Sequence, residues 1–201
     1  MKSPFIAAMA LLSMTLAAAP APAPRLNSID QTAANVRTLN RGLGHLKQTE
    51  TWLDINESCA GGAKLIAYSD RGRIRRITFQ MHYSNWTQIA DYYFQNSHLV
   101  YVAQRIATPR WNEKRGVLEF THISSSTFRE YFMRHGKLVK YRQRGANASI
   151  PPYTAANLLH DANLYKRAIH SGKASVNMAD LEKAPAKPHR TSSRPAGKAV
   201  Q

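Results

Sequence analysis

The chain has 201 residues, a formal net charge of +16 and a single cysteine. This length accommodates one ordinary domain with extensions, and one cysteine excludes an intramolecular disulfide framework and a multi-cysteine zinc site. Hydrophobic residues at 43% and aromatic residues at 9% exclude a wholly disordered chain. The sequence contains no nucleotide-binding loop, nucleophile elbow or metal-binding motif, and we predict no cofactor.

Residues 1–19 have the composition of a secretory signal peptide. Lys2 precedes an apolar stretch from Phe5 to Leu16, and three alanines follow it, which is the order of segments that signal peptidase requires. The stretch is shorter than the roughly 20 apolar residues that span a bilayer. We therefore expect an exported protein, periplasmic or secreted, with no transmembrane segment after cleavage and no role on chromosomal nucleic acid. Residues 20–27, rich in proline and alanine, are expected to form an extended linker.

A single α+β domain is expected over residues 28–170, and a helix should open it. Ser28, with Gln31 three residues later, fits a capping box. Apolar residues then recur at spacings of three and four, at Ile29, Ala33, Val36, Leu39, Leu43 and Leu46. This spacing predicts one apolar stripe along the helix, and Gly42 and Gly44 weaken its second half.

Three copies of a short pattern then predict β-hairpins. Residues 68–74, 93–99 and 132–138 share an aromatic residue, two variable residues, a polar turn residue, Gly or Ser, a polar residue and Ile or Leu. The Arg71-Gly72 and His135-Gly136 pairs, and Asn96, suit tight turns with positive φ. Residues 98–104 are apolar on both alternating sets and should form a central strand, and 117–123 a further strand. We expect an antiparallel β-meander of about six or seven strands.

The end of the chain is predicted to hold a second helix and a tail. Pro151 and Pro152 precede a helix expected over about 154–170, with Leu158, Leu159 and Leu164 as its packing residues. The amino-terminal helix should cover one face of the sheet, and this carboxyl-terminal helix should pack on or beside it. Residues 171–201 are basic and nearly free of large apolar side chains, which predicts a disordered tail.

The hairpin pattern resembles two kinds of protein. The segment Tyr92-Tyr93-Phe94-Gln95-Asn96-Ser97-His98-Leu99 is similar to the Tyr-Tyr-Phe-x-Asn-Gly-x-Leu segment of small exported proteins common in Bacteroidota-like bacteria, with Ser97 in place of the glycine. The hairpins also distantly resemble MORN-type repeats, although the copies here are 25 and then 39 residues apart and not regularly spaced. The resemblance covers roughly residues 51–144 and implies hairpins without implying an activity.

Scattered polar residues allow metal-binding and catalytic hypotheses. Histidines lie in or beside the expected strands, and His82 and His122 on facing strands, with Asp91 or Glu119, would make a metal site. Glu119 and Glu130 could form a carboxylate pair for sugar cleavage. Cys59 is either a packed small residue or a reactive or intermolecular thiol. An envelope-polymer hydrolase built from scattered His and Glu residues is therefore the second hypothesis. It would need three residues to converge in one concave pocket out of His82, His98, His122, Asp91, Glu119 and Glu130.

Basic residues carry the leading hypothesis. Residues 25–170 contain 21 basic and 10 acidic residues, a net charge of +11 that the tail does not explain. Basic residues cluster around the first and third hairpins, and because side chains alternate across a strand several of them should project together. The predicted anion-binding residues are Arg73, Arg75, Arg76, Lys140, Arg142 and Arg144. The other interpretation is an ordinary solvated surface.

We therefore expect a non-enzymatic binding or scaffolding domain whose basic surface meets an anionic envelope lipid, a glycan or an acidic protein. A third hypothesis is an assembly factor that adds a strand to a partner through an open sheet edge.

Overall fold

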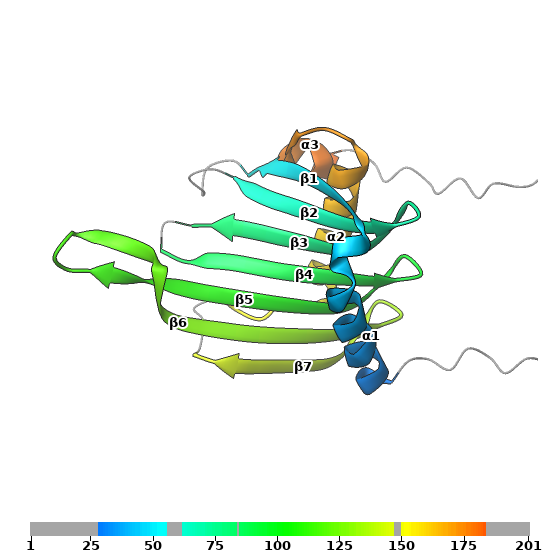
Figure 1. The fold of residues 1–201 in the computed structure, drawn as a ribbon, viewed down its shortest axis with the longest axis horizontal. Helices are drawn as coiled ribbons and strands as arrows, with labels where there is room; N and C mark the ends of the chain where they lie inside the picture. Colours follow the sequence, from blue (N-terminus) through cyan, green and yellow to red (C-terminus); the bar gives the residue numbers. More distant parts are fainter. Residues whose placement is uncertain (1–27, 56–61, 84, 147–149, 184–201) are drawn as a thin grey trace, which may run out of the picture.

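The computed structural model describes residues 28–55, 62–83, 85–146 and 150–183. The expected signal peptide and linker, Cys59 and the last part of the tail lie outside these ranges. The described residues form one eight-stranded sheet in the order β7-β6-β5-β4-β3-β2-β1-β8 (Figure 1). Its strands are β1 (Lys47–Asp54), β2 (Ala63–Asp70), β3 (Arg73–His82), β4 (Thr87–Gln95), β5 (His98–Asn112), β6 (Val117–Arg134), β7 (Lys137–Gly145) and β8 (Ser175–Asn177).

Strands β1 to β7 form the antiparallel meander that the sequence predicts, with β5 in the interior of the sheet. All three predicted hairpin turns are present, and both central residues of each have positive φ, as a type I′ turn requires: 48° and 76° at Arg71-Gly72, 49° and 66° at Asn96-Ser97, and 47° and 73° at His135-Gly136. A β-bulge follows the aromatic residue of each copy, at Tyr68/Ser69, Tyr93/Phe94 and Phe132/Met133. The repeated pattern therefore encodes a turn and a bulge together.

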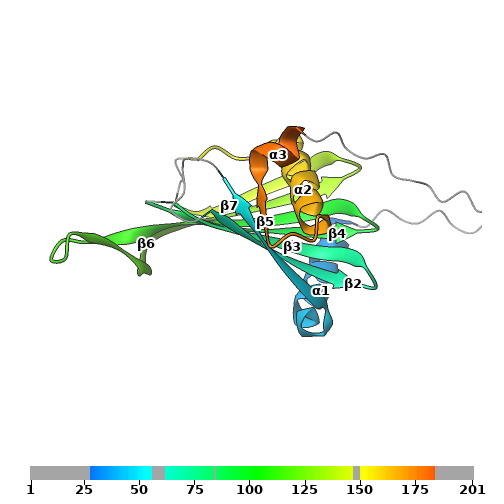
Figure 2. The same cartoon turned by 90° about the horizontal axis from the view of Figure 1, so that it is seen from above.

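Helix α2 (Ala155–His170) covers one face of the sheet (Figure 2). It begins at Thr154, whose side chain and that of Asn157 form a reciprocal capping box. The predicted packing residues Leu158 and Leu164 are fully buried, and Leu159 packs against the same core at partial exposure. Tyr165 stacks on Phe79 of β3, with ring centroids 5.1 Å apart. The main core thus lies between α2 and the sheet.

The prediction of a disordered tail from residue 171 is wrong for its first part. Residues 175–177 form β8, which pairs in parallel with β1 and brings the sheet to eight strands instead of six or seven. Helix α3 (Met178–Lys183) follows directly. Val176 and Leu181 are buried in the main core. Two apolar residues suffice to order this polar segment because they are buried against the existing core, where β8 pairs with the edge of β1 and α3 contacts α2.

Helix α1 (Ile29–Arg41) lies on the opposite face of the sheet from α2 and α3 (Figure 2). Its cap is Ser28, whose side chain accepts a hydrogen bond from the Gln31 amide, as predicted. The helix ends before Gly42, and a 3₁₀ turn η1 (Leu43–His45) follows, so the predicted apolar stripe does not continue as a helix to Leu46. Four α1 residues pack against a second cluster of Tyr93, Tyr101 and Phe132; they are Ile29, Ala33, Val36 and Leu39.

The distal parts of β5 and β6 extend beyond the rest of the sheet as a two-stranded arm (Figure 1). Trp111 and Val117 on this arm are exposed. Of the helices in the described residues, none combines the length and the apolar composition needed to cross a membrane.

Candidate binding face

The face of the sheet that carries α1 is organised as three rows of side chains. Each row takes one residue from each of β1 to β7, and strand pairing places every member directly opposite the next. Successive rows are two residues apart along each strand, so all three project from the same face. The aromatic row is Gln48, Tyr68, Arg76, Tyr93, Tyr101, Phe132 and Lys140; the acidic row is Glu50, Ile66, Thr78, Asp91, Ala103, Glu130 and Arg142; the exposed row is Trp52, Lys64, Gln80, Ile89, Arg105, Phe128 and Arg144.

The aromatic row supports α1. Arg76 lies between the rings of Tyr68 and Tyr93, 5.4 and 5.5 Å from their centroids. Its Nη1 donates to Oδ1 of Asn40 in α1 at 3.1 Å, and the Tyr93 hydroxyl donates to the same oxygen at 3.0 Å. Burial raises the pKa of Tyr93, so its hydroxyl stays protonated and keeps donating. These contacts fix the carboxyl-terminal end of α1 on the sheet.

The acidic row is largely engaged with neighbouring cations and hydroxyls. Asp91 Oδ1 accepts from Arg76 Nη2 at 2.6 Å and from the Thr78 hydroxyl at 2.7 Å. Glu130 accepts from the Tyr101 hydroxyl at 2.8 Å and lies 3.6 Å from Arg144. Burial and this bond to Glu130 raise the pKa of Tyr101 far above its usual range. The row therefore neutralises part of the basic charge on this face.

The exposed row lies beyond α1 and is open. Its three large apolar members, Trp52, Ile89 and Phe128, are 47%, 37% and 44% exposed. Basic side chains stand beside two of them: Lys64 Nζ is 6.0 Å from the Trp52 ring centroid, and the Arg105 guanidinium carbon is 5.6 Å from that of Phe128. Within the described residues Arg105 has no carboxylate at ion-pair distance. The row thus sets three exposed apolar side chains beside basic residues, with the half-buried Gln80 between Lys64 and Ile89.

Lys64 is also paired with the acidic row. Its Nζ lies 2.8 Å from Glu50 Oε2, and hydrogen bonding to Lys64 is the main cause that lowers the pKa of Glu50. The Glu50 carboxylate therefore stays ionised at neutral pH and remains paired with Lys64 of the exposed row.

The structure distributes the six predicted anion-binding residues over different environments. Lys140, Arg142 and Arg144 do share the α1 face, each at the β7 end of one row. Arg142 packs on the Phe132 ring, with 5.5 Å between its guanidinium carbon and the ring centroid. Arg73 is exposed beside the first turn. The last two members, Arg75 and Arg76, lie next to α1.

Arg73 and Arg75 alternate with Ile74, which packs against the main core under α2, so both are expected on the α1 face, and the bulge at Tyr68/Ser69 brings Arg76 onto the same face. The bulge leaves Arg75 without a cross-strand partner, next to Arg76 on the α1 side. Strands β3 and β7 are four spacings apart in the sheet, about 19 Å, and α1 packs on the strands between them. The two basic clusters therefore do not merge into one surface.

Sequence reasoning did not identify the exposed row. Trp52 precedes Leu53 and Ile89 precedes Ala90, and Phe128 lies between two buried polar residues, so the local pattern does not mark these three side chains as exposed. Which set stays uncovered depends on where α1 ends across the sheet, and only the tertiary structure gives that.

The proposed metal and catalytic residues are not gathered. His82 and His122 lie on β3 and β6, which two strands separate, so they do not face each other. Glu119 and Glu130 share β6 eleven residues apart, a separation of about 35 Å along a strand. Glu119 instead pairs with His122 on the arm, at 3.2 Å. In the described part of the chain no group of three or more His, Cys, Asp or Glu side chains has metal-binding geometry.

The sheet edges bear on the strand-addition hypothesis. β8 pairs with β1 along three residues at one edge, and β7 is the last strand at the other. β7 carries four basic residues, Lys137, Lys140, Arg142 and Arg144, and charged side chains on an edge strand discourage further strand pairing.

No protein-family model matches the sequence, and no curated protein or solved structure is significantly similar to it.

Proposed function

We propose that this chain is an exported binding protein and that its exposed row binds an acidic polysaccharide. The observation that carries the proposal is the register of the row, which lines up Trp52, Ile89 and Phe128 with basic residues between and beside them. The row crosses seven strands, six spacings or about 29 Å. An extended polymer lying across the strands meets one side chain after another. Export, expected from residues 1–19, would bring the domain to such polymers.

Exposed apolar side chains beside basic residues suit a chain of sugar rings with acidic substituents. The apolar faces of the rings can pack on the exposed parts of Trp52, Ile89 and Phe128. Acidic substituents can meet the guanidinium of Arg105 and that of Arg144, whose side chain is 75% exposed.

The acidic row favours a polysaccharide over single-stranded nucleic acid. It runs parallel to the exposed row about 7 Å away and presents the carboxylates of Glu50 and Glu130. The many hydroxyl groups of a polysaccharide can donate hydrogen bonds to those carboxylates, whereas an oligothymidylate offers far fewer donors.

The test measures binding of the full chain to a heparin fragment and to an oligothymidylate by isothermal titration calorimetry, at low and high salt. We expect heparin to bind more tightly than the oligothymidylate, and salt to weaken the binding. Arg105→Gln and Phe128→Ala should each weaken heparin binding by about tenfold, the loss expected for one charge-assisted or stacking contact. Lys114→Gln is the matched control, since it removes an exposed charge from the arm.

Three outcomes would overturn the proposal. They are an equal loss in Arg105→Gln and Lys114→Gln, no heparin binding at low salt, and tighter binding of the oligothymidylate than of heparin. The last would assign the same row to single-stranded nucleic acid.

A further inference from the structure

A groove lies between α1 and the turn end of β3, β4 and β5, away from the exposed row. Its volume is about 450 Å³, within the range of about 300–1,000 Å³ of small-molecule sites. Apolar residues from both sides line it: Val36 and Leu39 of α1, Tyr93 of β4 and Val100 of β5. No α1 residue is fully buried, so the helix covers this part of the sheet without filling the space beneath it.

One basic side chain enters the groove without an acidic partner. Arg75 is the bulged residue of β3 and lines the groove. Its neighbour Arg76 is held by Asp91, whereas Arg75 forms no ion pair with any carboxylate in the described residues. Arg75 is half-buried, so an anion that it binds is partly shielded from water and the interaction is stronger than at the open surface.

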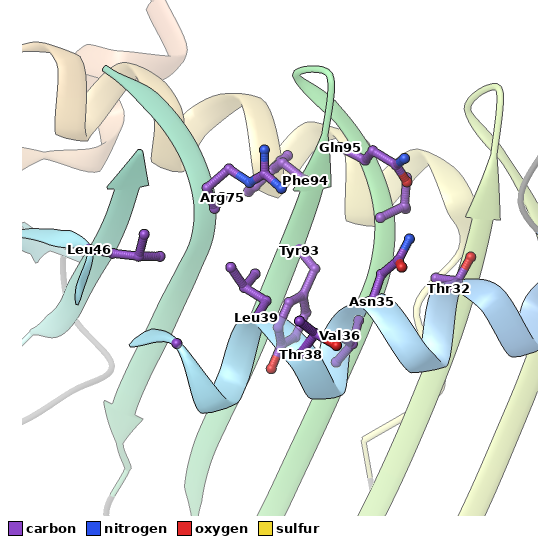
Figure 3. A pocket seen from close by; sticks show the side chains of 12 residues that line it. Thr32, Asn35, Val36, Thr38, Leu39, Leu46, Arg75, Tyr93, Phe94 and Gln95 are labelled. Carbon is purple, nitrogen blue, oxygen red and sulfur yellow. The ribbon is translucent and has the colours of Figure 1, made fainter. Parts of the chain in front are cut away.

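Arg75 and the two amide side chains of the groove lie at opposite ends of it. In Figure 3 Arg75 lies at the same end as Leu39 and Leu46, whereas Asn35 and Gln95 lie at the other end. A ligand with an acidic head at Arg75 can place an apolar chain against Leu39, Val36 and Val100. The amides at the far end limit the length of that chain, because burying them against hydrocarbon carries a cost.

We infer that this groove binds a medium-chain carboxylate, with the carboxylate on the Arg75 guanidinium and the hydrocarbon chain between α1 and the sheet. A planar guanidinium matches a carboxylate through two parallel hydrogen bonds. The inference concerns a second site and is independent of the proposed polysaccharide site.

The test titrates dodecanoate, below its micelle concentration, into the full chain by isothermal titration calorimetry. We expect one bound dodecanoate per chain and at least tenfold weaker binding of dodecanol, which lacks the charge. Arg75→Gln should weaken dodecanoate binding by about tenfold. Arg73→Gln is the matched control, because Arg73 lies two residues away on the same strand, is exposed and does not line the groove.

A second variant tests the space itself. Thr38 is an exposed α1 residue that lines the groove, so Thr38→Trp adds bulk from the helix side without disturbing a core position. We expect it to abolish dodecanoate binding while the thermal unfolding midpoint and heparin binding stay as in the wild type. The inference is overturned if dodecanoate does not bind, if dodecanol binds equally well, if Thr38→Trp leaves binding intact, or if Arg75→Gln and Arg73→Gln have the same effect. Heparin binding is measured on every variant. A loss of dodecanoate binding at the groove can then be distinguished from a loss of heparin binding at the exposed row.

Discussion

Arg129 is a fully buried guanidinium that binds the carbonyls of Ile150 and Pro151 just before α2, and its replacement tests how much these contacts stabilise the fold. It lies on the α2 face of β6 at 2% exposure. Its Nε donates to Gln143 Oε1 at 3.0 Å, its Nη1 to the Pro151 carbonyl at 3.1 Å and its Nη2 to the Ile150 carbonyl. Within the described residues it has no carboxylate partner.

The expected cost of Arg129→Met follows from these contacts. Each charge-assisted hydrogen bond contributes about 1.5–3 kcal/mol, and relief of the desolvation penalty of a buried cation offsets much of the sum. Pro151 is exposed and Ile150 half-buried, so water can reach at least one freed carbonyl. We expect a loss of about 2–3 kcal/mol in the free energy of unfolding. For a chain of this size that loss lowers the thermal midpoint by roughly 5–10 °C.

Urea unfolding and thermal unfolding followed by circular dichroism measure this change. Arg110→Met, at an exposed position on the arm, is the control and should change stability by less than about 0.5 kcal/mol. Amide exchange of Tyr153, whose N–H donates to the Tyr131 hydroxyl at 3.2 Å, should accelerate in Arg129→Met. Equal stability of the two variants, with unchanged exchange at Tyr153, would refute the reasoning.

Two further predictions concern stability. Burial raises the pKa of Asp161 above its usual 3.8, although a hydrogen bond from Tyr92 and the charge of His160 act in the opposite direction. The native state therefore binds this proton more tightly than the unfolded state does. As a result, wild-type stability falls as pH rises from near 3.8 through the raised pKa. Asp161→Asn should therefore be more stable than wild type at pH 7 and approach it near pH 3 in urea titrations; a less stable variant at pH 7 would contradict this. Gly145 has φ 90°, and an added Cβ would lie 2.2 Å from the Ser126 carbonyl oxygen, so Gly145→Ala should cost about 3 kcal/mol or more. Gly116→Ala, at φ 61° with open space around it, should cost about 1–2 kcal/mol from backbone strain alone, and equal melting temperatures for the two alanine variants would show that the clash is absent.

The hairpins and helix starts could be predicted because their causes are local. A turn residue that tolerates positive φ, such as Asn96 or Gly136, specifies the turn wherever the hairpin lies. Ser28 and Thr154 likewise cap their helices through residues three positions away. The sequence also predicts that two helices pack on the sheet, because each helix has an apolar stripe that must be buried.

The candidate sites could not be predicted in the same way. One bulge decides that Arg75 lies beside Arg76, and the presence of a groove there depends on where α1 packs on the sheet, for which the sequence contains no local signal. The sequence suggests that Arg76 is a surface charge, but it forms an ion pair with Asp91. Val176 lies in a segment of polar composition, but its side chain is buried and its strand pairs with β1.

The sequence by itself determined the three hairpins and the starts of α1 and α2, because turns and caps depend on residues a few positions apart. It did not indicate β8 or α3. It also determined the positive balance of the charge, including the +11 of residues 25–170. Only the tertiary structure decided where that charge acts. Strand register brings Trp52, Arg105 and Phe128 into one row from distant parts of the chain, and the place where α1 ends on the sheet decides that this row stays open.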